Sequence, residues 1–262
     1  MKLPTLGGAQ LWADRRWRDG WRVQQHALTG HHRLLDASNR SHRYGGLAEC
    51  IDGLPEAHHY EEVIILLHGL GRSGRSMRSM GDALRKAGHT VAELDYPSTR
   101  RPIAAHAGQV REVIEALDVD SVSFVTHSLG GIIARTILAR GDLSVRARRL
   151  VMCAPPSRGA SLARVLHERV TGVFGAVMGP VGAELAGVLT LPAPEVPSLV
   201  VAGSSGRAAG YNPLIEGDDD GIVAVSETKL EGAEHQVVES IHTLVMNHPD
   251  AQAAAVRFLS VS

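Results

Sequence analysis

The amino-acid sequence predicts an α/β fold, in which a mostly parallel central sheet carries helices on both faces. Short runs of consecutive apolar residues alternate with longer segments whose apolar residues recur at helical spacing. Strands that are apolar on successive residues are typical of parallel sheets buried on both faces. Their alternation with helices is typical of repeated βαβ units.

Six short runs are expected to be strands: 63–67, 90–94, 122–126, 150–154, 198–202 and, at the edge, 236–240. Four segments are expected to be helices: 76–87, 103–117, 129–139 and 249–259. Gly88 suits the C-terminal cap of the first helix, and Pro249 suits the first turn of the last.

Residues 1–60 do not follow this alternation. They hold all three tryptophans and the turn signals Asp19-Gly20 and Asp52-Gly53. These residues are predicted to form a small antiparallel extension packed on the main sheet. The whole chain, 1–262, is expected to be one domain, since single α/β domains often exceed 200 residues.

The segment 157–195 is rich in Gly, Ala and Val and lies between two expected strands. Short helices are expected there over Leu162–Val170 and Val181–Leu189. A segment inserted at this place in such a fold usually covers the active site, which favours a short cap or lid. A plain connecting pair of helices is the alternative, and composition does not separate the two.

Composition excludes several classes of protein. The chain has 44% hydrophobic and 21% charged residues and a formal net charge of −1, which gives no basic surface for nucleic acid. No apolar run approaches the ~18 residues of a membrane span, and the first residues lack a signal-peptide core. A cytoplasmic protein is therefore expected, although the sequence leaves the oligomeric state and any Cys50–Cys153 pairing open.

Ser128 stands in Thr126-His127-Ser128-Leu129-Gly130-Gly131, directly after an expected strand and directly before an expected helix. A serine at this junction is held on a tight turn with its hydroxyl exposed, as a nucleophile requires, and small residues must follow it. The alternative is that Ser128 only caps the helix.

The run His68-Gly69-Leu70-Gly71 follows the first central strand. Acyl transfer needs two N–H donors aimed at the developing oxyanion, and we assign them to the backbone of Leu70 and Leu129. A nucleotide loop is disfavoured because the glycines miss the G-x-G-x-x-G spacing.

Asp218, Asp219 and Asp220 supply the acid that a serine–histidine pair needs. Three adjacent carboxylates repel one another, so we expect one to be buried and the others to stay in water. Asp220 is favoured because it stands at the Asp-Gly turn before Ile222. A solvated acidic turn is the alternative.

His242 lies in an expected loop, Ile241–Thr243, between the edge strand and the last helix, where its ring can reach Ser128 and Asp220. The order Ser, Asp, His, with each residue at the carboxyl end of a strand, matches this chemistry. No metal-ligand spacing accompanies the other histidines, and no cofactor is expected.

The HGLG, THSLGG, DGIV and IHTL segments together resemble the α/β-hydrolase superfamily, in particular its small bacterial lipase and carboxylesterase branch. The resemblance covers residues 60–262 and implies an α/β-hydrolase fold, a Ser128–Asp220–His242 catalytic triad and an oxyanion hole at Leu70 and Leu129. One position departs from the family pattern: Thr126 replaces the first glycine of G-x-S-x-G, which is expected to strain the turn further.

The expected function is that of a serine carboxylesterase that hydrolyses a small-molecule ester through an acyl-enzyme. Few aromatic residues and an apolar 157–195 segment favour short-to-medium acyl chains. An acyltransferase or thioesterase would use the same triad, and a hydrolase fold that binds without catalysis is a third alternative.

Overall fold

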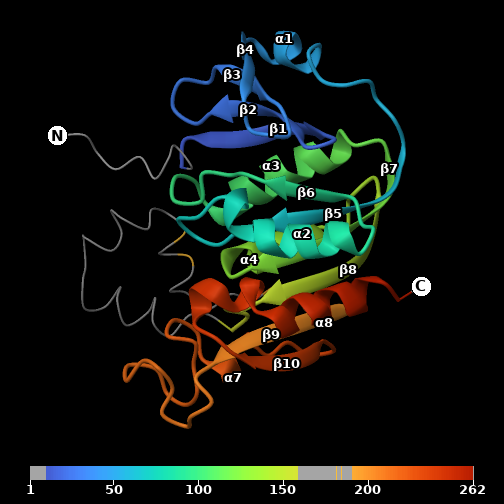
Figure 1. Ribbon diagram of the computed structural model, residues 1–262. Coiled ribbons are helices and arrows are strands. Elements are labelled where there is room, and N and C mark those ends of the chain that lie inside the picture. The colour runs from blue at the N-terminus through green and yellow to red at the C-terminus, as the bar shows by residue number, and fades with distance from the viewer. Residues whose placement is uncertain (1–9, 159–180, 182–183, 185–190, 262) are drawn as a thin grey trace, which may run out of the picture.

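The computed structural model describes residues 10–158, 181, 184 and 191–261, and its described part forms two sheets (Figure 1). The larger sheet has six strands in the order β10-β9-β8-β7-β5-β6, and each pair of neighbouring strands is parallel. The predicted parallel α/β core is therefore confirmed.

The strands of this sheet are β5 (Tyr60–Leu67), β6 (Val91–Leu94), β7 (Val119–His127), β8 (Arg146–Cys153), β9 (Ser198–Ser204) and β10 (Glu234–Glu239). The accompanying helices are η2 (Gly74–Met77), α2 (Arg78–Lys86), α3 (Ile103–Glu115), α4 (Leu129–Ala139), α7 (Val225–Thr228), η3 (His242–Asn247) and α8 (Pro249–Leu259). The six expected strands are all present, with ends that differ by at most four residues.

Successive residues of β5 supply the two cores of the sheet. Val63 and Ile65 belong to the core that includes the buried side chains of α3 and α4. Ile64 and Leu66 belong to the core that includes those of α2 and α8. Helices α3 and α4 contact each other over one face, and α2 and α8 contact each other over the opposite face (Figure 1). This two-sided burial explains why residues 63–67 of the strand are all apolar.

The N-terminal extension is a four-stranded antiparallel sheet followed by a short helix. Its elements are β1 (Trp12–Arg18), β2 (Trp21–His26), β3 (His32–Leu35), β4 (Ser41–Gly45) and α1 (Leu47–Ile51). Asp19 and Gly20 both have positive φ, 51° and 80°, as a tight hairpin turn between right-twisted strands requires. The antiparallel extension predicted from the sequence is confirmed.

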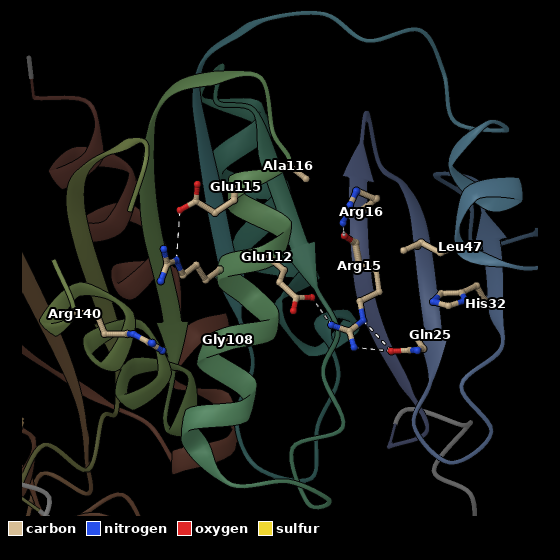
Figure 2. A pocket seen from close by; sticks show the side chains of 11 residues that line it. Arg15, Arg16, Gln25, His32, Leu47, Gly108, Glu112, Glu115, Ala116 and Arg140 are labelled. Atoms are coloured by element: carbon tan, nitrogen blue, oxygen red, sulfur yellow. Dashed lines mark hydrogen bonds and ion pairs between the residues drawn. The ribbon is translucent and has the colours of Figure 1, made fainter. Parts of the chain in front are cut away.

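The extension docks at one edge of the large sheet and against helix α3. The N–H of Asp14 in β1 donates to the carbonyl of Asp95, just past edge strand β6, at 3.0 Å. Figure 2 shows Arg15 directed at helix α3, where Nη1 lies 2.5 Å from a carboxylate oxygen of Glu112. A cleft of about 690 Å³ lies between β1 and α3. It is lined by neither Ser128 nor His242.

Several other expectations concern single features. Cys50 and Cys153 are both buried and free. None of the helices that the structure describes is long and apolar enough to cross a membrane. Most of the 157–195 segment lies outside the described residues, including all of the expected helix Leu162–Val170 and all of Val181–Leu189 except Val181 and Glu184.

Candidate active site

Ser128 lies between the end of β7 and the start of α4. Its backbone has φ 52° and ψ −119°, a conformation that L-residues rarely adopt. The turn is fixed because the Ser128 N–H donates to the Cys153 carbonyl at 2.9 Å and the Gly131 N–H donates to the Ser128 carbonyl at 2.9 Å. The hydroxyl makes no capping bond to the helix. The fold therefore holds Ser128 in a strained strand-to-helix turn, the conformation that a nucleophilic serine would require.

The structure brings together the three side chains that the sequence singled out. Nε2 of His242 lies 3.0 Å from Oγ of Ser128, and Nδ1 of His242 lies 2.8 Å from Oδ2 of Asp220. The Asp220 carboxylate can only accept a hydrogen bond, so this network assigns the proton of the His242 ring to Nδ1. The lone pair of Nε2 then faces the serine hydroxyl. The arrangement is that of a general base poised against a hydroxyl.

The main chain of His242 is held as firmly as its ring. Its N–H donates to the Asp220 carbonyl at 2.8 Å, and its carbonyl accepts from Nε2 of His127 at 2.9 Å. His242 also begins the 3-10 helix η3, where the sequence had suggested only a loop. Contacts on both sides of the residue restrict where the ring can move.

The carboxylates of the acidic run correct one expectation. Asp220 is 1% exposed, but Asp219 is 0% exposed, so burial is not confined to one of them. Oδ1 of Asp220 accepts from the N–H groups of Ile222 and Val223 at 3.0 and 2.8 Å. Oδ1 of Asp219 accepts from the Gly221 N–H at 2.6 Å. Each carboxylate thus has its own backbone N–H donors, so both can be buried side by side. The expectation that only one would be buried considered the repulsion between the carboxylates and not these donors.

Leu70 and Leu129 are the residues expected to supply N–H donors. Leu70 follows β5 in a turn, and Leu129 is the first residue of α4. Within the described part of the chain, neither N–H donates a hydrogen bond to another backbone segment or side chain. Both N–H groups therefore lack a partner among the described residues, as the donors of an oxyanion hole would before substrate binds.

Gly130 allows the first turn of α4 to lie against the end of β5. A Cβ atom on this residue would stand 2.4 Å from the Leu67 carbonyl oxygen. Thr126, by contrast, adds no strained backbone: it lies inside β7, and its hydroxyl donates to the Val151 carbonyl at 3.2 Å. The strand accommodates this side chain, contrary to the expectation of further strain.

Gly130→Ala is expected to lower the free energy of unfolding by about 1–3 kcal/mol, since the added methyl group must displace backbone. Gly108→Ala in α3 is the matched control, because its Cβ meets nothing within 4 Å. The control should leave stability unchanged or raise it by up to about 1 kcal/mol. Urea denaturation of both variants measures the difference, and equal stabilities would contradict the close approach.

His127 is the site residue that the sequence analysis missed. It is fully buried, and burial lowers its pKa well below the usual value, which keeps the ring neutral. Its Nε2 donates to the carbonyl of His242, and the two rings lie 4.9 Å apart. Its position beside Ser128 was visible in the sequence, but its contact with a residue 115 positions away was not.

A buried layer of aromatic rings lies beneath the Leu70 turn. His68 stacks on Tyr96 at a centroid distance of 3.9 Å, and His106 of α3 lies 5.3 Å from the same tyrosine ring. Burial lowers the pKa of His106 to about 4. Neither ring nitrogen of His106 has a hydrogen-bond partner among the described residues. Burial therefore disfavours the protonated form of His106 in the folded state.

This burial predicts a pH dependence of stability. The unfolded chain takes up a proton at His106 near pH 6.5 and the folded chain only near pH 4, so stability is complete above 6.5 and falls as the pH drops through this window. When the pH is lowered from 7 to 4.5, the free energy of unfolding should fall by about 2 kcal/mol less in His106→Leu than in the unsubstituted protein. Urea unfolding at the two pH values measures this, and parallel losses would contradict it.

The fold and the site define a hydrolase scaffold with a serine on a strained turn. The family model described as alpha/beta hydrolase fold matches residues 62–187. Over those residues the chain is similar to the α/β-hydrolase superfamily. Within the described residues, no group of three or more His, Cys, Asp or Glu side chains is arranged to hold a metal ion.

Three similar proteins extend this comparison. An uncharacterized Mycobacterium tuberculosis protein is 26% identical over 160 residues, which cover 58% of this chain and 44% of that protein. A carbendazim-hydrolyzing esterase of Nocardioides is 29% identical over 113 residues, 40% of this chain and 47% of the esterase. The chain thus spans less than half the length of the curated relatives it matches. The mature lipase BlEst2 of Bacillus licheniformis has the same fold, with a TM-score of 0.63, 19% identity, and coverage of 80% of this chain and 97% of the lipase.

Proposed function

We propose that this protein is a serine carboxylic-ester hydrolase that acts through an acyl-enzyme on esters with short-to-medium apolar acyl chains. One observation carries the proposal: Asp220, His242 and Ser128 form an unbroken line of hydrogen bonds of 2.8 and 3.0 Å at the carboxyl edge of the sheet. A Ser128 that served only as a helix cap would not need hydrogen bonds that connect its hydroxyl to His242 and Asp220.

In the acylation step, Oγ of Ser128 attacks the ester carbonyl carbon while its proton passes to Nε2 of His242. The carbonyl oxygen becomes an oxyanion, which accepts hydrogen bonds from the N–H groups of Leu70 and Leu129. The bond between the carbonyl carbon and the alcohol oxygen then breaks. The alcohol leaves with the proton from His242, and the acyl group stays on Ser128.

In the deacylation step, a water molecule gives its proton to Nε2 of His242 and adds to the acyl carbon. The second tetrahedral intermediate releases Ser128, which recovers the proton from His242, and the carboxylic acid departs. Asp220 keeps its own charge throughout and stabilises the imidazolium in both steps. These steps use only side chains and backbone groups of this chain.

Apolar side chains beside the reacting groups support an apolar acyl chain. Ile222 follows Asp220 by two positions, while Ile241 and Leu244 flank His242; their exposed fractions are 37%, 44% and 48%. Exposed large aliphatic residues this close in the chain to two of the proposed catalytic residues would offer contacts to an apolar acyl chain. The names of the Nocardioides esterase and the Bacillus lipase agree with ester hydrolysis.

Initial rates on p-nitrophenyl esters from acetate to dodecanoate test this proposal. We expect hydrolysis, with kcat/KM highest for a short or medium chain and lower at both ends of the series. Adding acceptor alcohols or replacing the ester by a thioester in parallel assays distinguishes an acyltransferase or thioesterase. Failure to hydrolyse any member of either series would overturn the proposal.

A further inference from the structure

The turn that carries Leu70 is held by hydrogen bonds within itself and from neighbouring segments. It spans Gly69–Arg72 and is closed by the Arg72 N–H, which donates to the Gly69 carbonyl at 3.2 Å. Nδ1 of His68 lies 2.8 Å from the same carbonyl oxygen. Because the carbonyl and the N–H of one peptide point in opposite directions, fixing the Gly69 carbonyl also fixes the direction of the Leu70 N–H.

The Arg72 carbonyl and the Gly71 N–H of the turn are connected to Gln10, the first directly and the second through Ser98. Nε2 of Gln10 donates to the Arg72 carbonyl at 2.8 Å. Oε1 of Gln10 accepts from Oγ of Ser98 at 3.2 Å, and that Oγ accepts from the Gly71 N–H at 2.9 Å. Gly71 has φ 70°, a conformation that favours glycine and that its bonded N–H helps to hold.

Gln10 and Ser98 are built into the protein rather than lying on its surface. Gln10 is 7% exposed and Ser98 is 0% exposed. Oε1 of Gln10 also accepts from the Thr99 N–H at 3.0 Å, and the Gln10 carbonyl accepts from Nε of Arg100 at 2.5 Å. One side chain therefore ties the turn after β5 to the segment after β6.

A second tie runs from the same extension to the residues just beyond the turn. Oδ1 of Asp95 accepts from the Gly74 N–H at 2.7 Å, and Oδ2 of Asp14 in β1 accepts from the Asp95 N–H at 2.6 Å. Arg22 of β2 lies 2.6 Å from Asp95 and neutralises this buried group. The chain on both sides of Arg72 is thus anchored to the N-terminal extension.

We infer that Gln10 is a positioning residue for catalysis: through Ser98, Gly71 and Arg72 it fixes the turn that presents the Leu70 N–H to the oxyanion. The inference rests on the proposed function and gives the N-terminal extension a role in it. Oxyanion donors are effective because they are fixed before the reaction, and losing one costs about 10²–10³ in kcat. A donor that is loosened rather than lost should cost about tenfold.

The test compares Gln10→Met, which keeps the length of the side chain but removes its hydrogen bonds, with Ser98→Ala and the double variant. We expect each single variant to lower kcat on the best p-nitrophenyl ester about tenfold while KM changes less than twofold. The Ki of an alkylboronic acid, which forms a tetrahedral adduct, should rise in step with the loss of kcat/KM. The double variant should lose much less than the product of the single losses, since both act on one turn.

Arg15→Met is the matched control, because Arg15 ties the same extension to α3 and makes no contact with the turn. It should leave kcat and Ki unchanged even where it lowers the melting temperature. Hydrogen exchange of the peptide covering residues 68–74 should be faster in Gln10→Met than in Arg15→Met.

Two results would overturn the inference. In the first, Gln10→Met has the same kcat and the same Ki as Arg15→Met. In the second, Gln10→Met loses kcat but the Ki of the boronic acid does not rise. If the unsubstituted protein hydrolyses no ester, the proposed function fails first. Hydrogen exchange then decides the structural part alone, and equal exchange in the two variants would reject it.

Discussion

Replacing Ser128 by alanine is expected to lower kcat on the best ester substrate by a factor of about 10⁴ or more. The substitution removes the oxygen that we propose forms the acyl-enzyme. This Oγ lies 3.0 Å from Nε2 of His242, to which its hydroxyl can donate. The fold should survive, because Ser128 makes its structural bonds through its backbone N–H and carbonyl. Initial rates and circular dichroism of the variant measure the two effects separately.

His242→Ala and the double variant sharpen this prediction. The two groups act in one step, so the double variant should be about as slow as the slower single variant rather than slower by the product. Ser205→Ala is a matched control, since Ser205 has the same exposed fraction of 9% but bonds to Asp218. Its kcat should stay within about threefold of the original, as is usual for a substitution outside the reacting groups. Multiplicative losses, or an inactive Ser205→Ala, would contradict the assigned roles.

Asp220→Asn is expected to lower kcat by about 10³–10⁴. Asparagine presents an N–H₂ or a neutral oxygen to Nδ1 of His242, so it neither fixes the required tautomer nor stabilises the imidazolium. The contact at stake is the 2.8 Å bond between Nδ1 and Oδ2. Oδ1 still receives the backbone donors of Ile222 and Val223, so most of the local structure should remain.

Asp219→Asn provides the matched comparison, since Asp219 is an adjacent buried carboxylate. Its oxygens accept from the N–H groups of Asn212 and Gly221 and do not contact His242. We expect a loss of stability of about 1–3 kcal/mol with kcat reduced less than tenfold. If Asp219→Asn abolishes turnover while Asp220→Asn does not, the choice of acid is wrong.

Much of the fold could be predicted because the sequence pattern is local. Helix α8 has the expected ends, since Pro249 suits a first turn and His248 caps it by accepting from the Asp250 N–H. Helix α4 also has the expected ends, because an apolar helical pattern begins directly after Ser128. The apolar runs defined the parallel strands because each residue of the strand meets a core on one face or the other.

Contacts between distant segments were not predictable. Gln10 and Arg72 are 62 positions apart, and nothing in their local patterns links them. Asp219 was expected in water because its backbone donors arise only when the loop has folded. Likewise, the docking of the N-terminal extension on α3 depends on pairs such as Arg15 with Glu112, which hydrophobic periodicity does not encode.

The candidate site also contains features that the sequence predicted and features that it did not. Chain order and the positions of strand ends were enough to select Ser128, Asp220 and His242, whose side chains lie within hydrogen-bond distance of one another. Their catalytic roles stay predictions until activity is measured. The bond from His127 to the main chain of His242 was not foreseen, because it joins two loops from different strands.

Covalent labelling by a fluorophosphonate tests the central claim most directly. The reagent reacts only with a serine whose hydroxyl is activated by a base. Peptide mass spectrometry should find one adduct, on Ser128, and His242→Ala should react far more slowly. An adduct on another residue, or labelling of Ser128 at an unchanged rate in His242→Ala, would contradict the proposed nucleophile and base.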